Sequence, residues 1–155
     1  MMQTSFVHLR VSSEFSISRG LLRINEIVEN AQKLKMSAVA LTDLNNMFGM
    51  VKFFKKAEAA GIKPIAGTIL NLKSPSGEMG EILCLAKNNK GLKLLMGIIS
   101  KSQLHQENGN ISVSFDDLSS CADNIIVISG GSSSTIFNLA KHQKIQDLKT
   151  ELLSF

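Results

Sequence analysis

The sequence predicts an α/β fold built on a parallel sheet, either open or closed into a barrel. Segments with the apolar spacing of strands alternate with segments that have the spacing of helices, and four such units fit into the 155 residues. Several strand segments are short, uninterrupted apolar runs, which are typical of parallel strands buried on both faces. A closed barrel usually needs about 250 residues, so we interpret the chain as part of one domain of this type.

The first half of the chain alternates strands and helices. A regular change between apolar and polar residues indicates a half-buried strand, whereas apolar residues three and four apart indicate a helix with one buried stripe. The predicted elements, in chain order, are a strand at 6–11, a helix at 24–35, a strand at 38–42, a helix at 47–60 and a strand at 63–72. Gly61 stands where a glycine commonly ends a helix.

The second half continues the pattern with shorter elements. The run SPSG predicts a turn, and the apolar run EILCLA that follows predicts the next strand. The remaining predicted elements are a helix at 90–103, a helical turn at 115–120 capped by Ser114, a strand at 124–129, a helix from about 134 and an amphipathic segment at 145–155.

The composition is that of a soluble globular protein, with 44% hydrophobic and 19% charged residues. No apolar run approaches the roughly 20 residues of a membrane span, and no signal peptide is visible. We therefore expect a cytoplasmic protein without membrane contact, in which Cys84 and Cys121 stay reduced and Cys84 is a small buried hydrophobe. A net charge of +4 permits contact with nucleic acid, although the lysines are scattered and Trp and Tyr are absent.

Asp43 is the strongest local candidate for chemistry, because it follows a buried strand, where parallel α/β folds gather their ligands. It could equally cap the following loop or pair with an arginine. The run SGGSSS at 129–134 could cradle a phosphate, but it fits neither the Walker nor the dinucleotide pattern, so a plain turn is favoured. His105 and His142 are expected on helix surfaces, and His8 is expected to be a hydrogen-bonded strand residue.

Several long segments, taken in their order and spacing, resemble one family. They are FVHLRVSSEFS, GLLRINEIVENAQKLKMSAVALTD, NNMFGMVKFFKKAEAAGIKPIAG, LAKNNKGLKLLMGIISK and IIVISGG. From about Ser5 to Phe155 the sequence is similar to the amino-terminal PHP (polymerase and histidinol phosphatase) domain of bacterial DNA polymerase III alpha subunits. PHP phosphoesterases share only short metal motifs with it, so the resemblance is specific to the polymerase branch.

The resemblance implies a distorted seven-stranded (βα) barrel of the PHP type. Residues 1–155 would form the amino-terminal portion of a single PHP domain, with the polymerase domains absent from this chain. In metal-bearing members, His, Asp, Glu and Cys side chains at the strand ends hold three metal ions. In this sequence the cluster positions that the resemblance assigns are Arg10, Ser12, Arg19, Asp43, Leu44, Ile69, Glu81 and Gly131.

These side chains predict a degenerate metal site. Only Asp43 and Glu81 offer a carboxylate, and two carboxylates do not make a trinuclear cluster. The arginines at positions 10 and 19 add positive charge where cations would bind. We therefore expect no metal, no cofactor and no catalytic residue in this chain. We also predict that Arg10 or Arg19 pairs with Asp43 or Glu81, since a buried carboxylate needs a partner.

The resemblance also implies a function. The parent protein would be a DNA-directed DNA polymerase that uses Mg²⁺ and contacts DNA, while the inactive PHP domain supports it. The domain would also form a docking surface for the proofreading exonuclease subunit and contact other replicase subunits. The competing interpretation is a metal-dependent phosphoesterase, either a proofreading nuclease or a pyrophosphatase. A third interpretation is a stand-alone nucleic-acid-binding module. Its only support is the pI of about 9.2.

Overall fold

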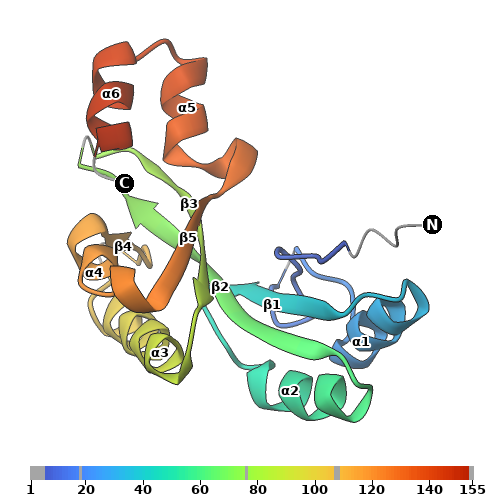
Figure 1. Cartoon of the computed structure of the whole chain (residues 1–155). Coiled ribbons are helices and arrows are strands. Elements are labelled where there is room, and N and C mark those ends of the chain that lie inside the picture. The colour runs from blue at the N-terminus through green and yellow to red at the C-terminus, as the bar shows by residue number, and fades with distance from the viewer. Residues whose placement is uncertain (1–5, 18, 76, 107–108, 154–155) are drawn as a thin grey trace. The chain divides into compact units, whose positions relative to one another are not determined.

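The computed structural model describes residues 6–17, 19–75, 77–106 and 109–153 (Figure 1). They form two compact units, the first ending at Thr68 and the second beginning at Ile69. The boundary falls inside the long strand β2 (Lys63–Lys73), so each unit contains one part of this strand. Strands and helices occur in both units, and the predicted mixed α/β character is confirmed.

The first unit combines helix α1 (Ile24–Lys33), strand β1 (Ala38–Leu44), helix α2 (Met50–Ala59) and the beginning of β2. Helix α1 packs against both α2 and β1. The apolar stripe predicted for α1 is the face that is buried, and its buried residues are Ile24, Ile27, Val28 and Ala31. Nearly all of β1 is buried, as its continuous apolar run predicts.

Helix α2 ends in the way that the sequence predicts. Gly61 has a φ of 71°, and its N–H donates to the carbonyl of Glu58 at 3.0 Å. The N–H of Ile62 donates to the carbonyl of Ala57 at 2.9 Å, which completes a Schellman motif. The helix begins at Met50 rather than near residue 47.

The later start of α2 has a local cause in the residues before it. The Asn46 side-chain oxygen accepts the N–H of Phe48 at 3.2 Å, and the Asn46 amide donates to the carbonyl of Leu44 at 2.9 Å. Such bonds from an asparagine side chain to nearby backbone stabilise a turn in competition with a helix. The chain therefore turns at Asn46 before the helix starts.

Residues 6–11 do not form the regular strand that the alternating pattern predicts. They lie along β1, where the N–H groups of Ala40 and Thr42 donate to the carbonyls of His8 and Val11 at 2.9 and 2.8 Å. The Thr42 hydroxyl accepts the N–H of Val11 at 2.9 Å and donates to the Val11 carbonyl at 3.1 Å. The Thr42 side chain thus takes the place of a backbone partner and interrupts the backbone hydrogen bonds that a regular strand would form with β1.

The second unit holds the end of β2 together with β3 (Met79–Ala86), β4 (Val113–Ser114) and β5 (Ile125–Ser129). Strands β2 and β3 are neighbours joined by a short turn, which two backbone hydrogen bonds close. The N–H of Ser74 donates to the Glu78 carbonyl at 2.8 Å, and the N–H of Gly77 donates to the Ser74 carbonyl at 2.9 Å. A connection this short can join only antiparallel strands.

The prediction of a parallel sheet is correct for one described pairing and wrong for another. Strands β2 and β4 are parallel, with Leu72 opposite Val113. Strands β3 and β5 are antiparallel, with Ile82 opposite Ser129 and Ala86 opposite Ile125. The hairpin after β2 reverses the direction of β3, so a strand that runs with β2 must run against β3. The apolar runs that suggested parallel strands indicate burial on both faces, and the hairpin decides the strand direction here.

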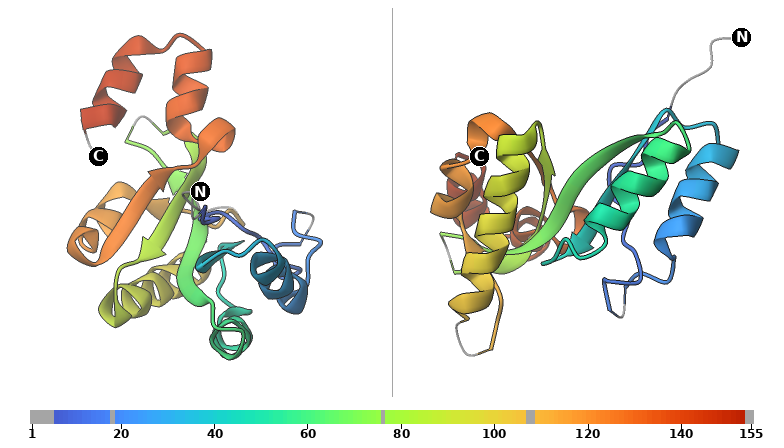
Figure 2. Two further views of the ribbon diagram at one scale, coloured as in Figure 1. Left: turned by 45° about the vertical axis from the view of Figure 1, so that its right-hand side comes forward. Right: turned by 90° about the horizontal axis from the view of Figure 1, so that it is seen from below.

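The helices of the second unit include α3 (Asn89–Leu104), α4 (Phe115–Ser119), α5 (Thr135–Lys141) and α6 (Ile145–Leu153), with short 3-10 turns at Ala122–Asn124 and Gly131–Ser133. Helix α3 packs on β3, and α5 and α6 lie side by side (Figures 1 and 2). The side-chain oxygens of Asn88, Ser114 and Ser134 cap α3, α4 and α5, as predicted for Ser114. None of the helices in the described ranges has the length and apolar character that a membrane crossing requires.

Candidate functional site

Asp43 is a buried carboxylate near the end of β1, with only 1% of the residue exposed. Its Oδ1 atom accepts the backbone N–H of Ser13 at 2.7 Å and the hydroxyl of Ser16 at 2.6 Å. Its Oδ2 atom accepts the hydroxyl of Ser13 at 2.8 Å. Hydrogen bonds from three donors therefore offset the cost of burying this carboxylate.

The two serine hydroxyls also accept backbone N–H groups. Ser16 Oγ accepts the N–H of Leu44 at 3.0 Å, and Ser13 Oγ accepts the N–H of Phe15 at 3.3 Å. On the other side of the strand end, Thr68 donates its hydroxyl to the Asp43 carbonyl at 2.8 Å. This polar cluster joins the segment from Ser13 to Ser16 to β1, and the sequence analysis did not find it. Its only sequence signal is the run SSEFS before the first helix.

Asp43 is one of the two carboxylates predicted to pair with Arg10 or Arg19, and other donors surround it. Within the described part of the chain, the donors to the Asp43 carboxylate belong to Ser13 and Ser16. Arg10 and Arg19 are both exposed residues. Two hydroxyls and one backbone N–H already donate hydrogen bonds to the carboxylate. Bringing an exposed guanidinium to this buried site would cost the arginine its hydration. The pairing of Glu81 with an arginine stays a prediction.

The surroundings of Asp43 do not fit a metal ligand. Three donors direct their protons at the carboxylate oxygens and take three of its roughly four lone-pair sites, which leaves little capacity for a cation. Ser12 lies nearby but donates its hydroxyl to the Thr42 carbonyl at 3.4 Å. Across the described residues, His, Cys, Asp and Glu side chains nowhere gather in a group of three or more that could hold an ion.

The other predicted cluster positions divide between the two units. Leu44 is half-buried at the end of β1 in the first unit. In the second unit, Ile69 is a buried residue of β2 and Glu81 is a buried residue of β3, with 2% and 6% exposed. Gly131 is exposed in the turn after β5, with a φ of 69° that favours glycine.

The run from Ser129 to Ser134 forms the plain turn that the sequence analysis favoured. Gly130 approaches the backbone of β3 so closely that a Cβ atom there would lie 2.2 Å from the carbonyl oxygen of Glu81. Ser134 caps α5, and its hydroxyl accepts the N–H of Phe137 at 3.1 Å. Gly130 thus allows a close contact with the backbone of β3, and Gly131 allows a tight turn.

His105 and His142 lie on helix surfaces as expected, whereas His8 is hydrogen-bonded through its backbone but does not lie in a regular strand. His105 and His142 are exposed residues at the ends of α3 and α5. The carbonyl of His8 accepts the N–H of Ala40, and its ring contacts Phe6 edge to face, with ring centres 4.8 Å apart.

Both cysteines are buried and free, as predicted for Cys84. Burial, together with a smaller effect of the neighbouring Cys121, raises the pKa of the Cys84 thiol to about 12. A thiol with this pKa stays protonated at neutral pH. Because the thiolate is the reactive form, Cys84 is a core residue and not a nucleophile.

The sequence was also compared with known families and proteins. The sequence pattern of the PHP domain family matches residues 8–155. DNA polymerase III subunit alpha of Borreliella burgdorferi is 34% identical over 163 aligned positions, which cover 99% of this chain and 14% of that protein. The Pseudomonas aeruginosa and Escherichia coli proteins of the same name are 39% and 37% identical and are aligned with 87% and 84% of this chain.

The chain spans a small part of these relatives, between 12% and 14% of their length. Among solved structures, a putative metal-dependent phosphoesterase from Bifidobacterium adolescentis superposes with a TM-score of 0.50 at 18% identity. The superposition covers 63% of this chain and 32% of that structure. At this identity the likeness concerns the fold alone.

Proposed function

Because this chain belongs to the PHP domain family and is homologous to the amino-terminal part of DNA polymerase III alpha subunits, we propose that it is a domain of a replicative DNA-directed DNA polymerase. The observation that carries the proposal is the similarity to several alpha subunits over nearly the whole chain. The polymerase reaction would use Mg²⁺ and take place in other parts of the longer protein, in the cytoplasm.

The proposed role of the domain is structural. Its resemblance to the family supports a distorted seven-stranded barrel in the longer protein, of which this chain supplies the amino-terminal portion. The domain would support the polymerase and offer a docking surface to the proofreading exonuclease subunit and other replicase subunits. DNA would be contacted through the parent polymerase.

A degenerate metal site is part of this proposal. Two observations support it: the Asp43 carboxylate is occupied by serine donors, and arginines stand at positions 10 and 19. Positive charge at ligand positions opposes cation binding by Coulomb repulsion. A phosphoesterase that depends on bound metal would therefore lack its cluster.

Metal analysis tests the degenerate site directly. The purified chain, dialysed against manganese or zinc, is expected to retain far less than one equivalent of metal and to show no phosphoesterase activity above the buffer. Asp43→Asn would leave both results unchanged. Stoichiometric metal in the wild-type chain, together with activity that Asp43→Asn abolishes, would establish the phosphoesterase alternative instead.

A binding experiment tests the docking role. The chain and its exonuclease subunit, taken from the same organism, are expected to form a complex in sedimentation velocity at micromolar concentration. A complex that forms with the full alpha subunit but not with this chain would assign docking to another part of the polymerase. This result would remove the docking role and leave the family assignment intact.

A further inference from the structure

A polar groove lies in the second unit, between the end of α3 and the segment that forms β4 and α4. It encloses about 170 Å³. Its polar lining comes from Lys73, Lys101, Ser102, His105, Ser112, Ser114 and Asp117. The proposed structural role of the domain makes no use of this groove.

The side chains that line the groove carry a net positive charge. Lys73 and Lys101 contribute two positive charges and Asp117 removes one, so the sum is +1 with His105 counted as neutral. Lys73 is the exposed last residue of β2, and Lys101 and His105 lie at the end of α3. The cations thus come from two elements and face one cavity.

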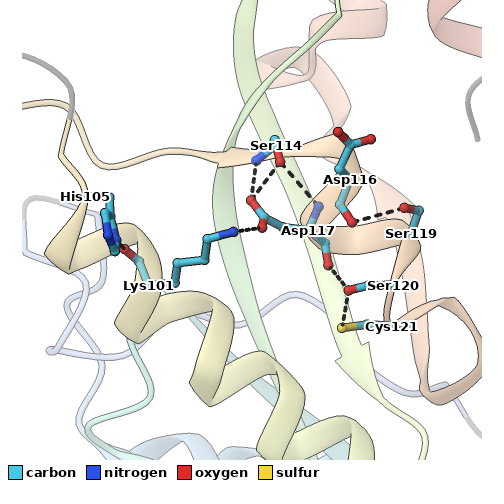
Figure 3. Close-up of polar contacts among 8 residues, drawn as sticks. All are labelled: Lys101, His105, Ser114, Asp116, Asp117, Ser119, Ser120 and Cys121. Carbon is cyan, nitrogen blue, oxygen red and sulfur yellow. Dashed lines mark hydrogen bonds and ion pairs between the residues drawn. The ribbon is translucent and has the colours of Figure 1, made fainter.

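The Asp117 carboxylate accepts hydrogen bonds from Lys101 and Ser114 within the chain (Figure 3). Its Oδ1 atom lies 2.5 Å from Lys101 Nζ, and its Oδ2 atom accepts the Ser114 hydroxyl at 2.7 Å and the Ser114 N–H at 3.1 Å. This carboxylate holds the Lys101 ammonium at the groove. An ammonium has three N–H donors, so one bond to Asp117 leaves others for a ligand.

The ion pair persists over the neutral pH range. The hydrogen bond from Lys101 to Asp117 and their mutual attraction raise the pKa of Lys101. Partial burial would raise the pKa of Asp117, but hydrogen bonds from Lys101 and Ser114 outweigh this effect, so the pKa is lowered. Both groups therefore stay charged, and Lys101 is oriented before any ligand binds.

His105 is also held in place. Its Nδ1 atom lies 3.0 Å from the carbonyl oxygen of Lys101, which can only accept a hydrogen bond, so Nδ1 carries a proton (Figure 3). This hydrogen bond fixes the imidazole ring at the groove.

We propose that this groove binds a phosphoryl group. Lys73 and Lys101 would supply charge-assisted hydrogen bonds, and the Ser112 hydroxyl lies at the same cavity. A tetrahedral oxyanion accepts donors from several directions, which suits ammonium groups on different elements. The phosphoryl group belongs either to a single-stranded DNA backbone or to a free phosphate.

The experiment is an NMR titration of the 155-residue chain with two probes, inorganic phosphate and a short oligothymidine with hydroxyl ends. Either probe is expected to shift the amide resonances of residues 73, 101–105 and 112–117 and leave those of the first unit unchanged. Lys73→Met is expected to weaken binding about tenfold. Ser112→Ala should also weaken binding and is the second variant if Lys73→Met disturbs the spectrum.

The matched control is Lys93→Met. Lys93 is an exposed residue of the same helix as Lys101, about 12 Å away along the helix axis, so the variant removes the same charge outside the groove. Its affinity for both probes is expected to equal that of the wild-type chain.

The two probes identify the source of the phosphoryl group. Tighter binding of oligothymidine at the groove assigns a DNA backbone, and tighter binding of inorganic phosphate assigns a free phosphate. Resonance shifts spread over all exposed lysines, or an equal loss of affinity in Lys93→Met and Lys73→Met, would overturn the proposal. These results do not depend on the role of the domain in the polymerase.

Discussion

The hydroxyl of Ser16 donates to Asp43 Oδ1 at 2.6 Å and at the same time accepts the N–H of Leu44 at 3.0 Å. One side chain thus connects a buried carboxylate to the backbone at the end of the strand that carries it. The arrangement stabilises a negative charge without a cation, because hydroxyl and amide dipoles point at it from fixed positions.

Replacement of Asp43 by alanine should destabilise the chain strongly. Asp43→Ala leaves the hydroxyls of Ser13 and Ser16 and one backbone N–H buried without their acceptor. We expect the free energy of unfolding to fall by about 3 kcal/mol in urea denaturation. Glu58→Ala, which removes an exposed carboxylate from α2 in the same unit, is the control and should change it by less than about 0.5 kcal/mol. Equal losses in the two variants would contradict a structural role for Asp43.

Gly130 should not tolerate a side chain. A Cβ atom at this position would lie 2.2 Å from the carbonyl oxygen of Glu81, which belongs to the backbone of β3 and cannot move independently. Gly130→Ala is therefore expected to lower the midpoint of thermal unfolding and to cost about 1–3 kcal/mol.

Gly97 provides the opposite case within the same unit. A Cβ atom there meets no other atom within 4 Å, and the residue lies inside α3. Gly97→Ala is expected to stabilise the chain by about 0.5–1 kcal/mol, because alanine loses less backbone entropy in a helix. The claim about Gly130 fails if both variants shift the midpoint in the same direction.

The ion pair between Lys101 and Asp117 should stabilise the chain in a defined pH window. The pKa of Asp117 is lowered from its ordinary value of 3.8, so its contribution is present above that pH and is lost as the pH falls through the folded-state pKa. The pKa of Lys101 is raised from 10.5, so its contribution is present below that pH and is lost as the pH rises through the folded-state pKa.

Asp117→Asn tests this window by urea denaturation. The variant should be less stable than the wild-type chain at about pH 7, and the difference should shrink at about pH 3. The difference should also be smaller in high salt, because 64% of the Lys101 side chain is exposed. Asp123→Asn replaces an exposed aspartate nearby and should show little dependence on pH. A stability difference that grows toward low pH would contradict the assignment.

Cys84 should resist thiol reagents in the folded chain. Its pKa of about 12 leaves almost no thiolate at neutral pH, and its burial excludes the reagent. Iodoacetamide labelling followed by mass spectrometry is expected to modify Cys84 and Cys121 slowly in buffer and rapidly in urea. Rapid modification of Cys84 without denaturant would show that this core opens.

The local elements were predictable, because local signals decide them. Ser114 caps α4, and Gly61 ends α2 with a positive φ, both at the positions that the sequence indicates. The first segment was harder to predict, since its pairing with β1 depends on the Thr42 hydroxyl about thirty positions away. The antiparallel pairing of β3 with β5 was predicted wrongly for a related reason, because strand direction depends on the preceding hairpin.

The sequence by itself determined the helices, the buried strands and the family, since apolar spacing and long ordered motifs are properties of the linear chain. Only the tertiary structure decided what surrounds Asp43. From the sequence, Asp43 could equally cap the following loop or pair with an arginine. The structure uses Ser13 and Ser16, which lie 30 and 27 positions from Asp43 in the chain. A buried carboxylate requires well-placed donors rather than opposite charge, and their placement exists only after the chain has folded.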